Sequence, residues 1–116
     1  MENKSKIVDR IIKTFPEFVN SEYYHGDLLD LPYVFIGDFG DYFQSQINKS
    51  DNKNVVEIIE FINRSYNNGS LEEQNQLFIG IFEVVGGNAN AIELLNNSLI
   101  KEALKDFSKL LNKEIF

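Results

Sequence analysis

The single histidine is the first residue to consider for catalysis or metal binding, because it lies among acids. His25 follows Glu22 by three residues and precedes Asp27 by two. A Glu and a His at this spacing can share one helical face, as they do in bundle proteins that bind two metal ions. Those sites take ligands from several helices and normally include a second histidine, which this chain lacks. We therefore expect a surface histidine among solvated acids, and keep a small metal-dependent enzyme as an alternative.

Other catalytic patterns are missing from the sequence. The chain has no cysteine, which excludes disulfides, thiolate zinc sites and cysteine nucleophiles. The glycine-containing segment 35–40 matches neither a phosphate loop nor the dinucleotide-binding fingerprint. Asp38 and Asp41 have i, i+3 spacing, but nothing marks them as a general acid and base, so we expect a solvated anionic face. The sequence predicts a non-enzymatic protein without catalytic residues, bound metal or cofactor.

An acidic, tyrosine-rich stretch is the feature most typical of a binding surface. Between Thr14 and Asn48 there is no Lys or Arg, while six of the 18 acidic residues and four of the five tyrosines lie there. Tyrosine provides a large contact area at low entropic cost, and carboxylates steer a basic partner into encounter. About half of these tyrosines are expected to belong to the core instead. The predicted partner-binding residues are Glu22, Tyr23, Tyr24, Asp27, Asp30, Tyr33, Asp38, Asp41 and Tyr42.

The overall charge and hydropathy narrow the choice of partner. The formal net charge is −7, so the average field repels nucleic acid and anionic membranes and favours a basic protein. No apolar run approaches the roughly 18 to 20 residues that a bilayer span needs. The N-terminus enters an amphipathic pattern directly, without the apolar segment of a signal peptide. We expect a cytoplasmic protein that binds another protein.

Hydrophobic periodicity predicts helices along the whole chain. Apolar stripes of 3.6-residue period cover about 7–15, 32–47, 55–66, 71–85 and 99–111, with a short segment at 89–95. No stretch shows the sustained period-two alternation of a strand, and 116 residues suit one domain. The sequence therefore predicts an all-α single domain over 1–116, either a compact bundle or a short irregular stack of about five to six helices.

Several residues carry signals for helix ends or close helix packing. Gly37 and Gly40 lie inside a predicted helix, where each costs about 1 kcal/mol relative to Ala, so we expect another backbone or a ligand to approach there. Capping residues are expected at the helix ends. They are Asp30 before Pro32, Gly69 in the left-handed conformation, the capping box Ser70 and Glu73, and Asn97 or Ser98.

The segment Leu31–Phe39 and the two helices through Phe61-Ile62 and Phe82-Glu83 resemble small, mostly helical bacterial proteins of uncharacterised families. The resemblance covers about two thirds of the chain. Some of those proteins are encoded beside secreted toxins and are interpreted as immunity proteins. The resemblance implies a small helical fold and neutralisation of a toxin, and it transfers no functional residue.

The sequence thus predicts an acidic interaction module, most concretely an immunity protein that binds and neutralises a basic toxin. One alternative is a structural or regulatory helical protein that self-associates through an uncovered apolar face. The other is the metal-dependent enzyme, with Glu22, His25 and Asp27 as ligands.

Overall fold

All regular structure in the described part of the chain is helical. The computed structural model describes residues 6–50 and 52–114. The predicted absence of a signal peptide concerns in part residues 1–5, which lie outside the described residues. No strand occurs within the described residues, which confirms the all-α class. The helices are α1 (Lys6–Thr14), α2 (Pro16–Val19), η1 (Gly26–Leu28), α3 (Pro32–Asn48), α4 (Asn52–Asn68), α5 (Leu71–Leu77), η2 (Phe78–Phe82), α6 (Glu83–Val85), α7 (Ala89–Ser98) and α8 (Lys101–Glu114).

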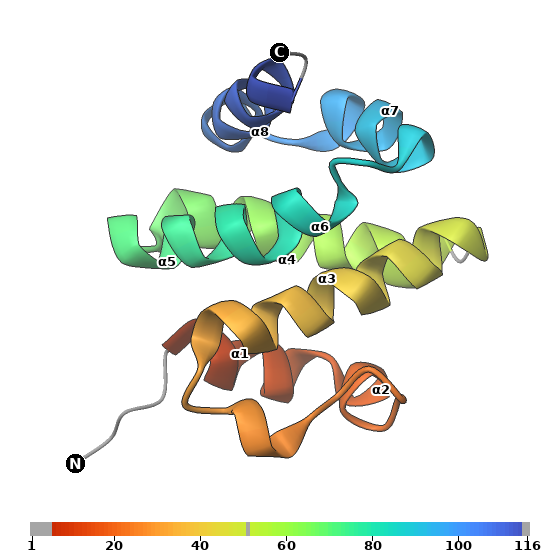
Figure 1. Ribbon diagram of the computed structural model, residues 1–116, viewed down its shortest axis with the longest axis vertical. Coiled ribbons are helices and arrows are strands. Elements are labelled where there is room, and N and C mark those ends of the chain that lie inside the picture. Colours follow the sequence, from red (N-terminus) through yellow and green to blue (C-terminus); the bar gives the residue numbers. More distant parts are fainter. Residues whose placement is uncertain (1–5, 51, 115–116) are drawn as a thin grey trace.

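The helices form successive tiers, with α3 at the centre (Figure 1). α1 and α2 lie on one side of α3, and η2 and α6 pack along its other side. α7 and α8 form the outermost tier. The Cα radius of gyration is 13.3 Å, close to the value of about 13 Å expected for one compact domain of this length. None of the described helices combines the length and the hydropathy that a membrane span requires.

α5, η2 and α6 follow one another without a break, and the predicted capping box starts this helix. Ser70 Oγ accepts a hydrogen bond from the Glu73 amide at 3.2 Å, and Glu73 Oε1 accepts one from the Ser70 amide at 2.8 Å. The helix ends before Gly86-Gly87, and it runs opposite to α4 (Figure 1). Its middle, η2, is a π-helical segment, which the periodicity did not predict.

Two glycines allow α3 and η2 to approach each other closely. A Cβ at Gly40 would lie 2.9 Å from the carbonyl oxygen of Gly80. A Cβ at Gly80 would lie 2.5 Å from Cγ2 of Ile36 and 2.7 Å from its Cβ. The expected backbone approach is thus confirmed at Gly40, whereas a Cβ at Gly37 would be 3.8 Å from its nearest neighbour, an ordinary contact.

Two predicted features of helix ends are wrong. The residue that precedes the first turn of α3 is Leu31 rather than Asp30, and no side chain caps that end; Pro32 needs no partner because it has no N–H. Gly69 is not left-handed, since no described glycine has a positive φ. The left-handed residue is Ser50, with φ 58°, after the end of α3.

The corner between α7 and α8 also differs from the prediction. α7 continues through Asn97 and Ser98, so neither residue caps α8. The side chain of Asn63, on α4, bridges the corner instead. Its Oδ1 accepts from the Ile100 amide at 3.0 Å and its Nδ2 donates to the Ser98 carbonyl at 3.2 Å. A residue distant in sequence therefore takes the place of the local cap.

Candidate protein-binding surface

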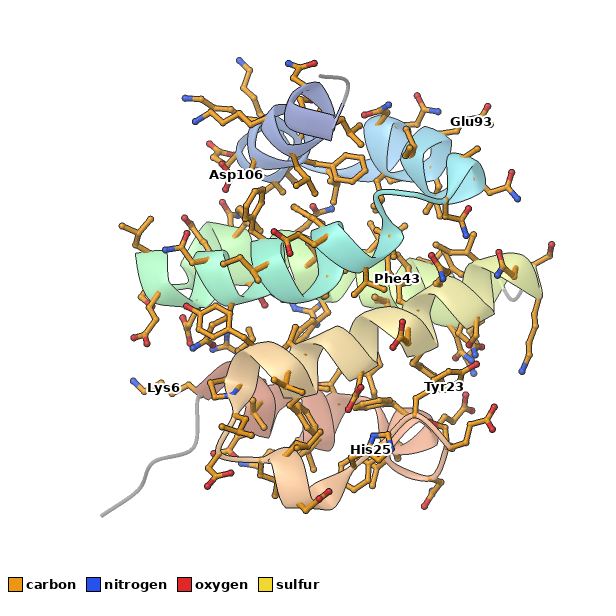
Figure 2. The ribbon with its side chains drawn as sticks, in the orientation of Figure 1. Lys6, Tyr23, His25, Phe43, Glu93 and Asp106 are labelled. Atoms are coloured by element: carbon orange, nitrogen blue, oxygen red, sulfur yellow. The ribbon has the colours of Figure 1, made fainter. Side chains whose placement is uncertain are left out.

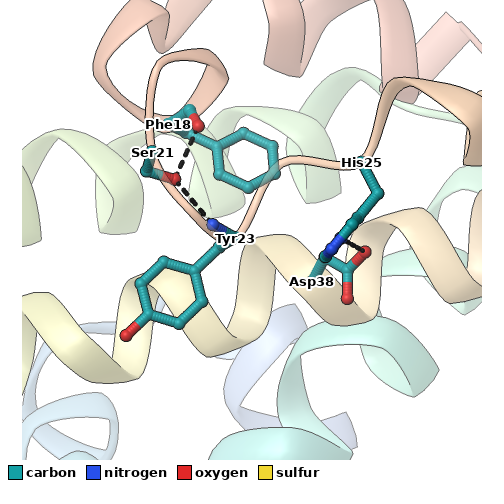
Figure 3. A network of polar contacts seen from close by, with 5 residues as sticks. All are labelled: Phe18, Ser21, Tyr23, His25 and Asp38. Carbon is teal, nitrogen blue, oxygen red and sulfur yellow. Dashed lines mark hydrogen bonds and ion pairs between the residues drawn. The ribbon is translucent and has the colours of Figure 1, made fainter.

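The irregular segment between α2 and α3 is held against α3 by aromatic rings. The ring of Phe18 lies edge-on to the rings of Tyr24 and Phe35, each with a centroid separation of 5.7 Å. Ser21 Oγ donates to the Phe18 carbonyl at 2.7 Å and accepts from the Tyr23 amide at 3.2 Å (Figure 3). These contacts fix the position of the segment that carries the first predicted partner-binding residues.

His25 is attached to α3 through an acid that is distant in sequence. Its Nδ1 lies 3.0 Å from Oδ2 of Asp38, thirteen residues later (Figure 3). The expected surface histidine is therefore tied to a carboxylate of α3. Among the described side chains, those of residues 6–50 and 53–112, no three His, Asp or Glu residues converge as metal ligands, so Glu22, His25 and Asp27 form no cluster.

The second predicted acid of α3 lies one turn beyond Asp38. Asp41 is exposed at its helix surface. Partial burial raises the pKa of the Asp41 carboxyl, and the negative charge of Asp38 raises it further. A raised pKa means that the folded protein holds the ionised form of Asp41 less favourably than water does. A cation placed beside these two carboxylates would relieve that unfavourable interaction.

Exposed apolar side chains lie at the start of α3 and directly before it. Leu31, Tyr33 and Val34 are 51%, 41% and 52% exposed, although large apolar residues are usually buried. Val34, Asp38 and Asp41 follow i, i+4, i+7 spacing, which places them on one helical face. We define the α3 surface as five residues: Leu31, Tyr33, Val34, Asp38 and Asp41.

The sequence prediction missed Leu31 and Val34 as candidate binding residues. Their positions relative to the buried apolar stripe of α3 could have identified them. The buried stripe contains Phe35, Ile36 and Phe39, so an apolar residue directly before it faces another direction in a helix of 3.6 residues per turn. The sequence prediction named only acids and tyrosines as partner-binding residues and gave these two aliphatic residues no role in binding.

One predicted binding residue belongs to the core. Tyr42 is only 4% exposed, because its ring packs 5.4 Å from that of Phe18 and 6.2 Å from that of Phe39. It therefore offers little surface to a partner, which corrects that prediction. The expectation that some tyrosines would be core is met at this residue.

The other predicted residues do not gather into one patch. Tyr23 and Tyr24 are half-buried, whereas Glu22, Asp27 and Asp30 are exposed. Tyr33 precedes Tyr42 by nine residues, or about 14 Å along the helix axis, and Tyr23 packs beside Tyr42, with a centroid separation of 6.3 Å. The predicted residues thus extend along α3, from Tyr33 at its start to Tyr23 beside its later turns.

The family assignment covers almost the whole chain. Residues 8–115 match the family described as a domain of unknown function, DUF7674. The chain belongs to this family. No curated protein and no solved structure gives a significant match. The functional interpretation of this DUF7674 domain therefore depends on its own residues.

Beside Tyr23, the DUF7674 domain has an open polar hollow of about 420 Å³. Asn54, on α4, is one of the residues that line this hollow. Its Nδ2 atom donates to Oε1 of Glu17 at 2.8 Å and to Oε1 of Gln46 at 3.1 Å. These bonds connect α4 with α2 and α3. The lining residues are Glu17, Ser21, Glu22, Tyr23, Tyr42, Gln46, Lys49 and Asn54. Because the lining residues include charges of both signs and two amides, we interpret the hollow as part of the polar rim of a binding surface.

Proposed function

We propose that this DUF7674 domain is a non-enzymatic interaction module whose α3 surface binds a basic protein. The observation that supports the proposal most is that the exposed side chain of Val34 shares one face of α3 with Asp38 and Asp41, while exposed Leu31 and Tyr33 lie at the start of the same helix. Exposed apolar groups that polar residues surround occur at protein interaction sites. The carboxylates accelerate encounter with a basic partner and orient it.

The electrostatics of Asp38 and Asp41 favour the same proposal. Partial burial raises the pKa of the Asp41 carboxyl in the isolated domain, and repulsion from the Asp38 carboxylate raises it further. A lysine or arginine of the partner would stabilise both ionised carboxylates. Binding thus becomes more favourable, because the partner's cation offsets the repulsion between Asp38 and Asp41 that is present in the free protein. This relation is common at functional sites, which retain groups that do not optimise stability.

In its most concrete form, the proposal is that the domain is an immunity protein of the cytoplasm. It would cover the active surface of a basic toxin. The net charge of −7 supports a basic partner. The resemblance of segment 31–39 and of the two helices that follow to small bacterial proteins encoded beside secreted toxins supports the biological setting.

A pair of matched valines tests the position of the binding surface. Val34, on α3, and Val56, on α4, are 52% and 50% exposed. With the product of the neighbouring gene as partner, Val34→Ser should raise the Kd about tenfold, since a central apolar contact is worth on the order of 1 to 2 kcal/mol. Val56→Ser should leave the Kd unchanged. Calorimetric titration of both variants measures these values.

Equal affinities of the two valine variants would refute the α3 surface as the binding site. The same titrations separate binding from self-association. If sedimentation equilibrium of the domain alone shows a dimer that Val34→Ser dissociates, the α3 surface covers a second copy and the proposal of a foreign partner is wrong.

A further inference from the structure

A small pocket between α1 and α4 differs in chemistry from the acidic surface. Its volume is about 170 Å³, and the buried residue Phe61 forms part of its wall. The polar residues around it come from the second half of α1 and from the last turns of α4. They are Arg10, Thr14, Arg64, Ser65 and Asn68.

Every polar residue that lines this pocket can donate hydrogen bonds, and no carboxylate lines it. This composition is notable in a chain of net charge −7. The guanidinium groups of Arg10 and Arg64 suit oxyanions because their planar arrays of N–H donors match the geometry of phosphate and carboxylate oxygens. The Thr14 hydroxyl and the Asn68 amide add neutral donors.

Arg64 has no ionic partner in the described chain. No ion pair joins it to any residue of 6–50 or 53–112, including Glu60, which lies one turn earlier on the same helix. The Thr14 and Asn68 side chains likewise make no hydrogen bond with a described residue. The pocket therefore presents donors whose hydrogen-bonding capacity is used by solvent.

Arg10 forms an ion pair with Glu73. Its Nη2 atom lies 3.4 Å from Oε2 of Glu73, and the second oxygen of that carboxylate accepts from the Ser70 amide at 2.8 Å. Oε2 is buried and has no hydrogen bond within the described structure. Glu73 does not line the pocket, so it can position Arg10 without occupying the place of a ligand. The two guanidinium groups outweigh this single carboxylate.

We infer that the pocket between α1 and α4 binds a phosphate-sized oxyanion, either inorganic phosphate or the phosphate group of a small molecule. Arg10 and Arg64 bind the anion by charge-assisted hydrogen bonds, and Thr14 and Asn68 donate to its remaining oxygens. The site is separate from the α3 surface in residues and in charge. The pocket would thus give the domain a small ligand in addition to the proposed protein partner.

Inorganic phosphate is the first probe. Titration into the ¹⁵N-labelled domain, with chloride at matched ionic strength as reference, should give saturable NMR shifts at Thr14, Arg64 and Asn68. Arg64→Gln should weaken binding about tenfold, the effect of one lost charge-assisted interaction. Lys101→Gln removes the same charge from an exposed residue of α8 and should leave affinity unchanged. Arg64→Lys, which keeps the charge without the planar fork, should fall between wild type and Arg64→Gln.

A phosphate monoester distinguishes the two sources of the anion. Tighter binding of ribose 5-phosphate than of inorganic phosphate, with the same loss in Arg64→Gln, identifies a phosphorylated small molecule; equal or weaker binding identifies free phosphate. Shifts that do not saturate, or equal affinities in Arg64→Gln and Lys101→Gln, would overturn the site. Val34→Ser should bind phosphate normally, so failure of the α3 surface and failure of this pocket give different results.

Discussion

At the scale of single residues, Gly80 has less room for a side chain than Gly37 and Gly40, the two glycines within α3. We predict that Gly80→Ala lowers the free energy of unfolding by about 2 to 4 kcal/mol, because the new methyl group collides with Ile36 on α3 and forces the helices apart. The intrinsic helix propensity of Ala recovers only about 1 kcal/mol. Urea denaturation followed by circular dichroism measures the change.

Gly87 provides the control for Gly80. A Cβ at Gly87 would meet nothing within 4 Å, and its φ is not positive. Gly87→Ala should therefore keep the wild-type stability or raise it by about 0.5 kcal/mol through reduced entropy of the unfolded chain. Similar losses in both variants would show that the α3–η2 approach does not limit stability.

The buried hydroxyl of Tyr66 makes stability depend on alkaline pH. Tyr66 donates to Oδ2 of Asp106 at 3.2 Å. Burial raises the pKa of the Tyr66 hydroxyl, and the charge of Asp106 and the hydrogen bond to it raise the pKa further. Because the folded protein holds this proton more tightly than the unfolded chain, its contribution is complete below about pH 10 and is lost as pH rises above that value.

Tyr66→Phe should remove this alkaline loss. The variant is expected to be about 1 kcal/mol less stable at neutral pH, since it lacks one hydrogen bond, but its stability should decline less steeply above about pH 10. Denaturant titrations at several pH values test this, with Tyr33→Phe, which changes an exposed ring, as control. Parallel pH profiles of wild type and Tyr66→Phe would contradict the assignment.

At the scale of helices, Asn63 holds the corner between α7 and α8. We predict that Asn63→Ala lowers the free energy of unfolding by about 1 to 3 kcal/mol, because the Ile100 amide and the Ser98 carbonyl lose their partner. Asn67→Ala, at an exposed residue of the same helix, should change stability by less than about 0.5 kcal/mol. Hydrogen exchange at Ile100 should also accelerate in Asn63→Ala alone; unchanged exchange there would contradict the bridging role.

The helix ends show which structural features can be predicted from sequence. The capping box of Ser70 and Glu73 was predictable, because both hydrogen bonds join residues three apart. The corner at Leu99–Ile100 was not, because its partner, Asn63, is 37 residues away from Ile100. Ser50 likewise takes a left-handed conformation that favours glycine. At the corner between α7 and α8, a contact from a distant residue thus replaces the local preference.

The same distinction applies to the candidate site. Acid spacing correctly placed Asp38 and Asp41 on neighbouring turns of α3. Residue type alone could not show that Tyr42 is buried against Phe18 while Val34 is exposed. The pairing of His25 with Asp38 joins residues thirteen apart, so it depended on the path of the irregular segment rather than on any motif.

At the scale of the whole molecule, the two candidate sites differ in chemistry and consist of different residues. Tyr23 and His25 lie together beside α3, whereas Glu93 lies on α7 in the outermost tier (Figure 2). The α3 surface presents carboxylates, and the pocket between α1 and α4 presents hydrogen-bond donors. One small domain can therefore offer a basic protein and an oxyanion separate sites.

The central proposal, that the α3 surface attracts a basic protein, is tested most directly by association kinetics. Stopped-flow mixing with the product of the neighbouring gene would compare wild type, Asp38→Lys/Asp41→Lys, and the control Glu93→Lys/Glu102→Lys, which reverses two exposed acids on α7 and α8. The α3 variant should associate at least about tenfold more slowly at low salt, and the difference should shrink as salt screens the charges. Equal association rates for the two variants at every salt concentration would contradict the proposal.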